Sequence, residues 1–146
     1  MSYLDPSTIR DSERGGITLA CVLVVEDDPW IQWMIADDLV DRGYQVVTAQ
    51  DGIEALERIA DVRPDVIVLD LMLPRSSGWA FAEQYQTVTG GEAIPIVVVT
   101  AAPNLTLRLA AHGVQRCLQK PFDIQEMARA VAQLTGPEPA IMPVLG

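Results

Sequence analysis

The hydrophobic positions of this chain form short, almost unbroken runs, and these alternate with segments whose apolar residues recur at helical spacing. Such runs occupy residues 19–25, 65–70 and 94–100, and two further strand-like segments that include polar residues occupy 44–49 and 114–119. Continuous apolar runs of this length are typical of parallel strands buried on both faces. Helices are predicted between and after them, over residues 28–42, 51–62, 79–89, 105–112 and 123–135. The expected fold is α/β.

Capping residues and breakers support these boundaries. Asp28 precedes Pro29, an N-cap followed by a proline at the first helical position, and Gly43 follows the end of the same helix. Parallel strands require crossover connections, and these are right-handed. The alternation therefore predicts one parallel sheet with helices on both faces. Ligands of such sheets bind beyond the carboxyl ends of the strands.

The two ends of the chain differ from its centre. Residues 1–16 end in two glycines and are expected to form a flexible leader, and the folded domain is expected over residues 17–135. Residues 136–146 contain three prolines and form a tail too short for a second domain. No apolar run is long enough to span a bilayer, and the first residues lack the apolar centre of a secretory signal. We therefore expect a cytoplasmic protein without membrane insertion.

Composition narrows the range of functions. The formal net charge is −10, from 20 acidic and 10 basic residues, which disfavours direct nucleic-acid binding through phosphate contacts. Cys21 and Cys117 both fall in apolar, strand-like runs, so they are predicted to be buried thiols rather than a disulfide or metal ligands. A single histidine excludes a cluster of histidine metal ligands.

Polar residues gather where the predicted strands end. The first strand is followed by Glu26 and Asp27, the third ends in Asp70, the fourth ends in Thr100, and the fifth leads into Lys120. Carboxylates that lie close together repel one another and favour a bound cation. Oxygen ligands without histidine or thiolate favour a hard ion, with Mg²⁺ as the first choice and Mn²⁺ as a substitute.

These residue types fit phosphoryl transfer. Such a transfer needs an in-line nucleophile, a metal ion that offsets charge, and donors that hold the phosphoryl oxygens. Asp70 can act as the nucleophile, while Glu26 and Asp27 hold the metal. Thr100 and Lys120 can contact the phosphoryl oxygens and move toward a new dianion, which would shift their loops.

Four sequence motifs carry a resemblance to a known family. They are Val24-Val25-Glu26-Asp27-Asp28-Pro29, Leu69-Asp70-Leu71-Met72-Leu73-Pro74 with Gly78, Val98-Val99-Thr100-Ala101, and Lys120-Pro121-Phe122. In this order and at this spacing, the chain resembles the receiver domains of response regulators over roughly residues 20–135. The resemblance implies a flavodoxin-like sheet of order 2-1-3-4-5 and a stand-alone receiver in two-component or phosphorelay signalling.

The resemblance also implies residue roles. Asp70 would be the phosphoacceptor, and the metal would be held by the acidic pair, Asp70 and the backbone carbonyl of Met72. Thr100, Ala101 and Lys120 would form the phosphoryl-binding and switch positions, and the Lys120–Pro121 peptide bond is often cis in this family. The phosphodonor would be a histidine kinase or a histidine phosphotransfer protein, and the output would pass to a downstream protein partner.

The chain departs from the family pattern at three points. Glu26 stands where the family usually has aspartate. The glutamate still provides a carboxylate for the metal. Cys117 stands where an aromatic or histidine residue usually reports phosphorylation. The segment between Thr100 and Lys120 is also somewhat short, so its helix is expected to be truncated or mobile. The last two departures leave open a pseudo-receiver that acts as a scaffold with an altered signalling face.

Two tryptophans form a separate feature of the first predicted helix. Ile31, Ile35 and Leu39 define its core-facing stripe, and Trp30 and Trp33 fall off that stripe close to each other. They are interpreted either as partly packed side chains or as a docking patch for a partner beside the acidic pocket.

Two alternative functions, an aspartyl phosphatase and a nucleotide-binding protein, are disfavoured by the residues that follow the predicted strands. Aspartyl phosphatases on related sheets generally need a second carboxylate two residues after the nucleophile, and Met72 occupies that position. We therefore expect chemistry at Asp70 itself rather than turnover of small phosphate esters. A nucleotide-binding loop is disfavoured because the turn after the first strand is acidic where a pyrophosphate needs glycines.

Overall fold

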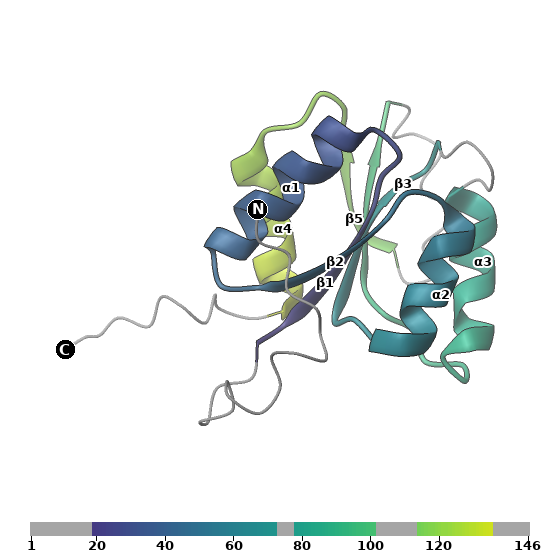
Figure 1. Cartoon of the computed structure of the whole chain (residues 1–146). Helices are drawn as coiled ribbons and strands as arrows, with labels where there is room; N and C mark the ends of the chain where they lie inside the picture. Colours follow the sequence, from purple (N-terminus) through teal and green to yellow (C-terminus); the bar gives the residue numbers. More distant parts are fainter. Residues whose placement is uncertain (1–18, 73–77, 102–113, 136–146) are drawn as a thin grey trace.

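The computed structural model describes residues 19–72, 78–101 and 114–135 (Figure 1). The strands are β1 (Cys21–Val25), β2 (Gln45–Ala49), β3 (Val66–Asp70), β4 (Ile96–Thr100) and β5 (Val114–Gln119). The helices are α1 (Pro29–Asp41), α2 (Gly52–Val62), α3 (Gly78–Val88) and α4 (Ile124–Thr135). The helix expected over residues 105–112, the leader and the tail lie outside the described residues.

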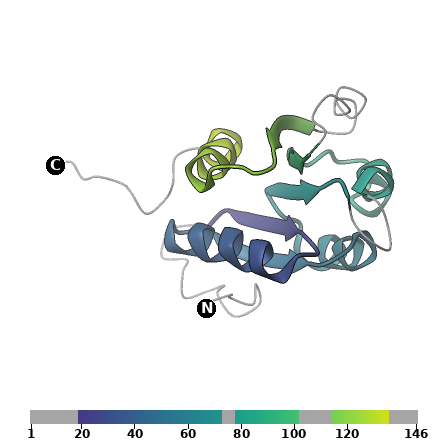
Figure 2. The same ribbon diagram turned by 90° about the horizontal axis from the view of Figure 1, so that it is seen from above.

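The five strands form one parallel sheet in the order β2-β1-β3-β4-β5. Helices α1 and α4 cover one face of this sheet, and α2 and α3 cover the other (Figure 2). The predicted flavodoxin-like α/β fold is therefore confirmed. Strand order reverses next to β1, which has β2 on one side and β3 on the other.

The hydrophobic core consists of two clusters, one on each face of the sheet. Side chains alternate along β1, so Val22 and Val24 pack under α1 and α4 while Leu23 and Val25 pack under α2 and α3. Each of the strands β1, β3 and β4 has five residues, and all of them are buried. This double burial explains why the central strands are uninterrupted apolar runs in the sequence.

Side-chain caps start the helices that flank the sheet. The Asp28 carboxylate accepts hydrogen bonds from the backbone N–H groups of Trp30 (2.9 Å) and Ile31 (3.2 Å) at the start of α1. The Asp51 carboxylate accepts one from the backbone N–H of Glu54 (2.8 Å) at the start of α2. The cap predicted at Asp28 is confirmed, and both caps fix where the chain leaves the carboxyl edge of the sheet.

Among the described residues, no helix combines the length and the apolar character that a membrane crossing requires. The two cysteines are free thiols, Cys21 buried in β1 and Cys117 half-buried in β5. Burial and the nearby Asp65 carboxylate raise the pKa of Cys21 to about 12, so this thiol stays protonated at neutral pH.

Candidate functional site

The parallel sheet brings the predicted polar residues to one edge. Glu26 and Asp27 directly follow β1, Asp70 is the last residue of β3, Thr100 is the last residue of β4, and Lys120 directly follows β5. The carboxyl ends of parallel strands lie side by side, so residues separated by up to about a hundred positions meet here. The polar residues that the sequence predicts at this edge of the sheet lie there in the structure.

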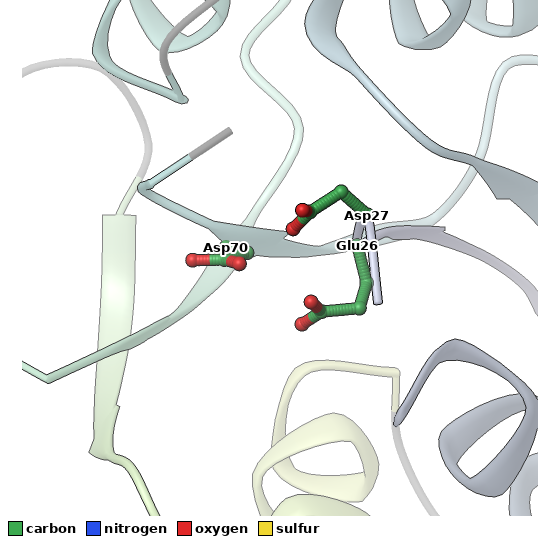
Figure 3. Close-up of side chains that lie close together, drawn as sticks. All are labelled: Glu26, Asp27 and Asp70. Atoms are coloured by element: carbon green, nitrogen blue, oxygen red, sulfur yellow. The ribbon is translucent and has the colours of Figure 1, made fainter. Parts of the chain in front are cut away.

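Three carboxylates form the centre of this edge. One carboxylate oxygen from each of Glu26, Asp27 and Asp70 lies within 4.8 Å of the others. Figure 3 shows the carboxylate groups of Glu26 and Asp27 extending toward the side on which Asp70 lies. Glu26 and Asp70 are only 3% and 4% exposed, whereas Asp27 is open to solvent. The cluster therefore has a buried base and an accessible side.

Lys120 supplies positive charge to the buried part of this cluster. Its Nζ lies 3.2 Å from Oδ2 of Asp70 and 3.4 Å from Oε1 of Glu26. The backbone N–H of Lys120 donates to the carbonyl of Thr100 at 2.9 Å, which ties the end of β5 to the end of β4. The ammonium group is thereby held between two carboxylates that come from different strands.

Asp70 is oriented from both of its oxygens. Oδ1 accepts a hydrogen bond from the backbone N–H of Met72 at 2.9 Å, and Oδ2 faces Lys120. The Asp70 Cα is paired with that of Val99 on β4. The side chain of Met72 is 69% exposed at the rim of the site. The carboxylate is thus pre-oriented on a rigid strand rather than on a mobile loop.

The protonation of Glu26 reflects its crowded position. Burial, and next the negative charge of Asp70, raise the pKa of Glu26 from 4.5 to about 7. The backbone N–H of Asp28, which donates to Oε2 of Glu26 at 3.2 Å, and the charge of Lys120 act in the opposite direction without cancelling the rise. Glu26 therefore changes charge near neutral pH.

The pKa of Lys120 is raised, although burial alone would lower it. Burial lowers the pKa of Lys120, but the negative charges of Glu26 and Asp70 outweigh it and hold the pKa above its ordinary value. Lys120 stays charged throughout the neutral range. The site is then anionic overall, with two or three carboxylates against one ammonium group.

This donor set fits a hard divalent cation. The clustered ligands are carboxylate oxygens from three residues, and the mutual repulsion that raises the Glu26 pKa is relieved by a positive ion between them. Mg²⁺ and Mn²⁺ both prefer such oxygen ligands. The exposed side at Asp27 leaves room for the waters that Mg²⁺ usually keeps.

The remaining predicted residues lie in, or directly after, β4 and β5. Thr100 is buried at the end of β4, and Ala101 is exposed immediately after it. The peptide bond between Lys120 and Pro121 is cis. Cys117 is half-buried in β5, and its side chain packs against the core on the side of α2 and α3.

Trp30 and Trp33 lie on the first two turns of α1, the helix that begins after Asp27 and Asp28. Their rings are stacked, with centroids 5.3 Å apart and an interplanar angle of 26°. Trp30 is 66% exposed and Trp33 is 40% exposed. Both side chains lie off the buried stripe of Ile35, Ala36 and Leu39. They form an exposed aromatic surface at the start of α1, called the tryptophan pair below.

One polar residue at this edge escaped sequence reasoning. Gln32 donates hydrogen bonds from its side-chain amide to the backbone carbonyls of Glu26 and Ala49. The sequence pattern could have indicated this residue. Gln32 lies four residues before the buried Ala36 and therefore on the core-facing side of α1. A polar side chain on a core-facing stripe needs hydrogen-bond partners, and here they are the ends of two strands.

Comparison with known proteins agrees with the fold. Residues 22–132 match the family model of the response regulator receiver domain. The response regulator MprA of Mycobacterium sp. (strain KMS) is 38% identical over 122 residues, which cover 80% of this chain and 52% of that protein. The hybrid signal transduction histidine kinase D of Dictyostelium discoideum is 41% identical over 115 residues, or 77% of this chain and 7% of the kinase. The chain thus spans about half the length, or less, of these curated relatives.

A solved receiver-domain structure has a similar fold. The receiver domain of the sensor histidine kinase PA1611 from Pseudomonas aeruginosa PAO1 aligns with a TM-score of 0.72 and 30% identity, covering 82% of this chain and 99% of that one. That structure has a magnesium ion coordinated in its active site cleft.

Proposed function

We propose that this chain, which belongs to the response regulator receiver family, accepts a phosphoryl group on Asp70 in two-component or phosphorelay signalling. The donor in this proposal is a phosphohistidine of a histidine kinase or a histidine phosphotransfer protein. One observation carries the proposal. The buried Asp70 carboxylate lies among the carboxylates of Glu26 and Asp27 and 3.2 Å from the Lys120 ammonium group.

The transfer exchanges one bond to phosphorus for another. A carboxylate oxygen of Asp70 forms the new P–O bond while the P–N bond of the donor breaks, and the imidazole nitrogen keeps that electron pair. Lys120 would offset the negative charge that arrives at Asp70, and the Thr100 hydroxyl would donate to a phosphoryl oxygen. The Met72 N–H keeps the Asp70 side chain oriented. These roles follow from charge and hydrogen-bonding capacity at the edge of the sheet.

In this proposal Glu26, Asp27, Asp70 and the backbone carbonyl of Met72 hold Mg²⁺ or Mn²⁺. A bound ion would supply the positive charge that stabilises the equatorial phosphoryl oxygens. The carboxylate cluster and the magnesium ion in the related Pseudomonas receiver support this choice. The output would pass through a protein partner, since the net charge of −10 disfavours DNA contacts.

Intact-mass spectrometry tests the acceptor. After incubation with acetyl phosphate and Mg²⁺, the wild-type protein should gain one phosphoryl group, and Asp70→Asn should gain none. Asp41→Asn is the matched control, because Asp41 is an exposed carboxylate at the far end of α1 and its variant should be labelled like wild type. Labelling of Asp70→Asn to the wild-type extent would refute Asp70 as the acceptor.

The tryptophan pair is proposed as the docking surface for the protein phosphodonor. Exposed, stacked aromatic rings beside the reactive edge provide the apolar area that protein interfaces use as anchors. Replacing both tryptophans by alanine should slow transfer from the protein donor about tenfold and leave labelling by acetyl phosphate unchanged. Val88→Ala, at an exposed apolar residue of α3 on the other face, is the control. Equal slowing with both donors would reject the docking role.

A pseudo-receiver scaffold is the second candidate, and Cys117 is the observation that favours it. This half-buried thiol occupies the β5 position where the family usually has the aromatic reporter of phosphorylation. The same mass measurement separates the two candidates. Failure of the wild-type protein to take up phosphate in the presence of Mg²⁺ would favour the scaffold, whereas stable labelling at Asp70 would exclude a purely structural role.

A further inference from the structure

Gln32 connects three elements at the edge that carries the acidic cluster. Its Nε2 lies 3.0 Å from the carbonyl oxygen of Glu26, which follows β1, and 3.3 Å from the carbonyl oxygen of Ala49, the last residue of β2. The amide group has two N–H bonds, so it can donate to both carbonyls at once. Gln32 itself is the fourth residue of α1, at the end of its first turn.

The backbone of Glu26 is consequently held on both sides. Its N–H donates to the Ala49 carbonyl at 3.0 Å, and its own carbonyl accepts from Gln32. That carbonyl belongs to the peptide plane that continues into Asp27. Because a peptide unit is planar, fixing the direction of its carbonyl also fixes the direction in which the chain enters Asp27.

Asp27 depends on this restraint more than its two neighbours in the cluster do. Glu26 and Asp70 are buried, so packing and ion pairing with Lys120 also hold them. Asp27 is exposed, and its carboxylate is placed by the backbone that carries it. On the other side of Asp27, the cap formed by Asp28 fixes the start of α1. Residues 26–28 connect β1 to α1. The Gln32 amide fixes the start of this connection at Glu26, and the helix cap fixes its end at Asp28.

We propose that Gln32 is a positioning residue for the metal site, because it fixes the peptide plane between Glu26 and Asp27 and thereby the place of the Asp27 carboxylate in the cluster. This inference rests on the proposed function, in which these carboxylates bind a divalent cation. Gln32 touches neither the cation nor the phosphoryl group. It acts through the backbone, so its loss reduces the affinity for the cation and leaves the reactivity of Asp70 at saturating metal unchanged.

Gln32→Met tests this role, because methionine is similar in length and has no donor. Gln32→Ala removes the same donors and favours the helix, so it provides a second folded variant. Thr89→Val is the structural control. The buried Thr89 hydroxyl lies within hydrogen-bonding distance of the carbonyls of Gln86 (3.2 Å) and Glu92 (2.6 Å) at the end of α3, so the control also loses a side-chain donor to the backbone, away from the acidic cluster.

Free Mn²⁺ is measured by electron paramagnetic resonance during titration of each full-length protein. Both Gln32 variants should bind Mn²⁺ about tenfold more weakly than wild type, the size typical of groups that orient metal ligands, and Thr89→Val should bind within about twofold of wild type. With acetyl phosphate, the Mg²⁺ concentration for half-maximal labelling should rise by the same factor at an unchanged maximal rate.

Three results would overturn the inference. One is wild-type Mn²⁺ affinity in both Gln32 variants, and another is an equal loss of affinity in Thr89→Val, which would assign the effect to general destabilisation. Wild-type protein that binds no Mn²⁺ would refute the proposed metal-dependent function itself, and the inference with it. The binding curve of the wild-type protein therefore separates failure of the premise from failure of the Gln32 role.

Discussion

The pH dependence of stability gives a direct measure of the crowding around Glu26. Glu26 is 3% exposed, and burial together with the charge of Asp70 raises its pKa to about 7. Between pH 4.5 and 7 the folded protein therefore holds a proton on Glu26 that the unfolded chain releases. Stability linked to this group is present below pH 4.5 and is lost as the pH rises through about 7.

The size of the effect follows from the shift. Each pH unit of separation between the folded and unfolded pKa corresponds to about 1.4 kcal/mol, so a rise from 4.5 to about 7 corresponds to about 3 kcal/mol. Glu26→Gln keeps the shape of the side chain and removes its charge. In metal-free solution the variant should be more stable than wild type at pH 8, by up to about 3 kcal/mol, and the two should converge near pH 4.5.

Urea denaturation at intervals from pH 4.5 to 8, with EDTA present, measures this difference. Glu83→Gln is the control, since Glu83 is an exposed carboxylate on α3 and its amide should leave the wild-type pH dependence intact. Adding Mg²⁺ at pH 8 should stabilise wild type more than Glu26→Gln. An identical free energy of unfolding for wild type and Glu26→Gln at every pH would refute the conclusion that Glu26 is a crowded, buried acid.

Two further substitutions test the rest of the electrostatic and packing argument. Lys120→Met removes the cation that pairs with Glu26 and Asp70. At pH 8 without metal, this variant should lose about 2 kcal/mol in the free energy of unfolding, and Mg²⁺ should restore part of the loss. Unchanged urea denaturation would contradict the pairing. Tyr85→Phe removes a buried hydroxyl that donates to the Ile94 carbonyl and accepts from the Ile94 N–H, and should cost about 2 kcal/mol while labelling by acetyl phosphate stays normal, a result that impaired labelling would oppose.

The order of the elements could be predicted because hydrophobic pattern and capping chemistry agree along this chain. Continuous apolar runs mark strands buried on both faces, and Asp28 and Asp51 mark helix starts by the hydrogen bonds that they make. The sheet order is not contained in that pattern. It came from the resemblance to receiver domains, and the observed order agrees with it.

The first residues of the strands were predicted less accurately than the order of the elements. Hydrophobicity does not show which backbone N–H and C=O groups form hydrogen bonds between strands. The run from residue 94 predicted the fourth strand, but β4 begins at Ile96. Ile94 is buried, yet its N–H bonds to the Tyr85 hydroxyl, and Pro95 has no N–H to donate to a neighbouring strand. Similarly, β1 begins at Cys21, two residues later than predicted.

The three members of the acidic cluster could be predicted by residue, but the Gln32 contacts beside it could not. Parallel topology forces Glu26, Asp27 and Asp70 to one edge, so their proximity follows from the fold class. The Gln32 amide, by contrast, binds backbone carbonyls of residues 6 and 17 positions away. Such bonds depend on the three-dimensional path of the chain, and nothing in the local sequence identifies the acceptors.

The stacking of Trp30 on Trp33 has a spectroscopic consequence. Two indole rings with centroids 5.3 Å apart interact through their transition dipoles, so their near-ultraviolet circular dichroism should carry a coupled signal that a single indole lacks. The pair sits on the opening turns of α1, directly after Asp27 and Asp28. The protein therefore contains its own optical label for movements of this helix start, and such movements can be followed without attaching a dye.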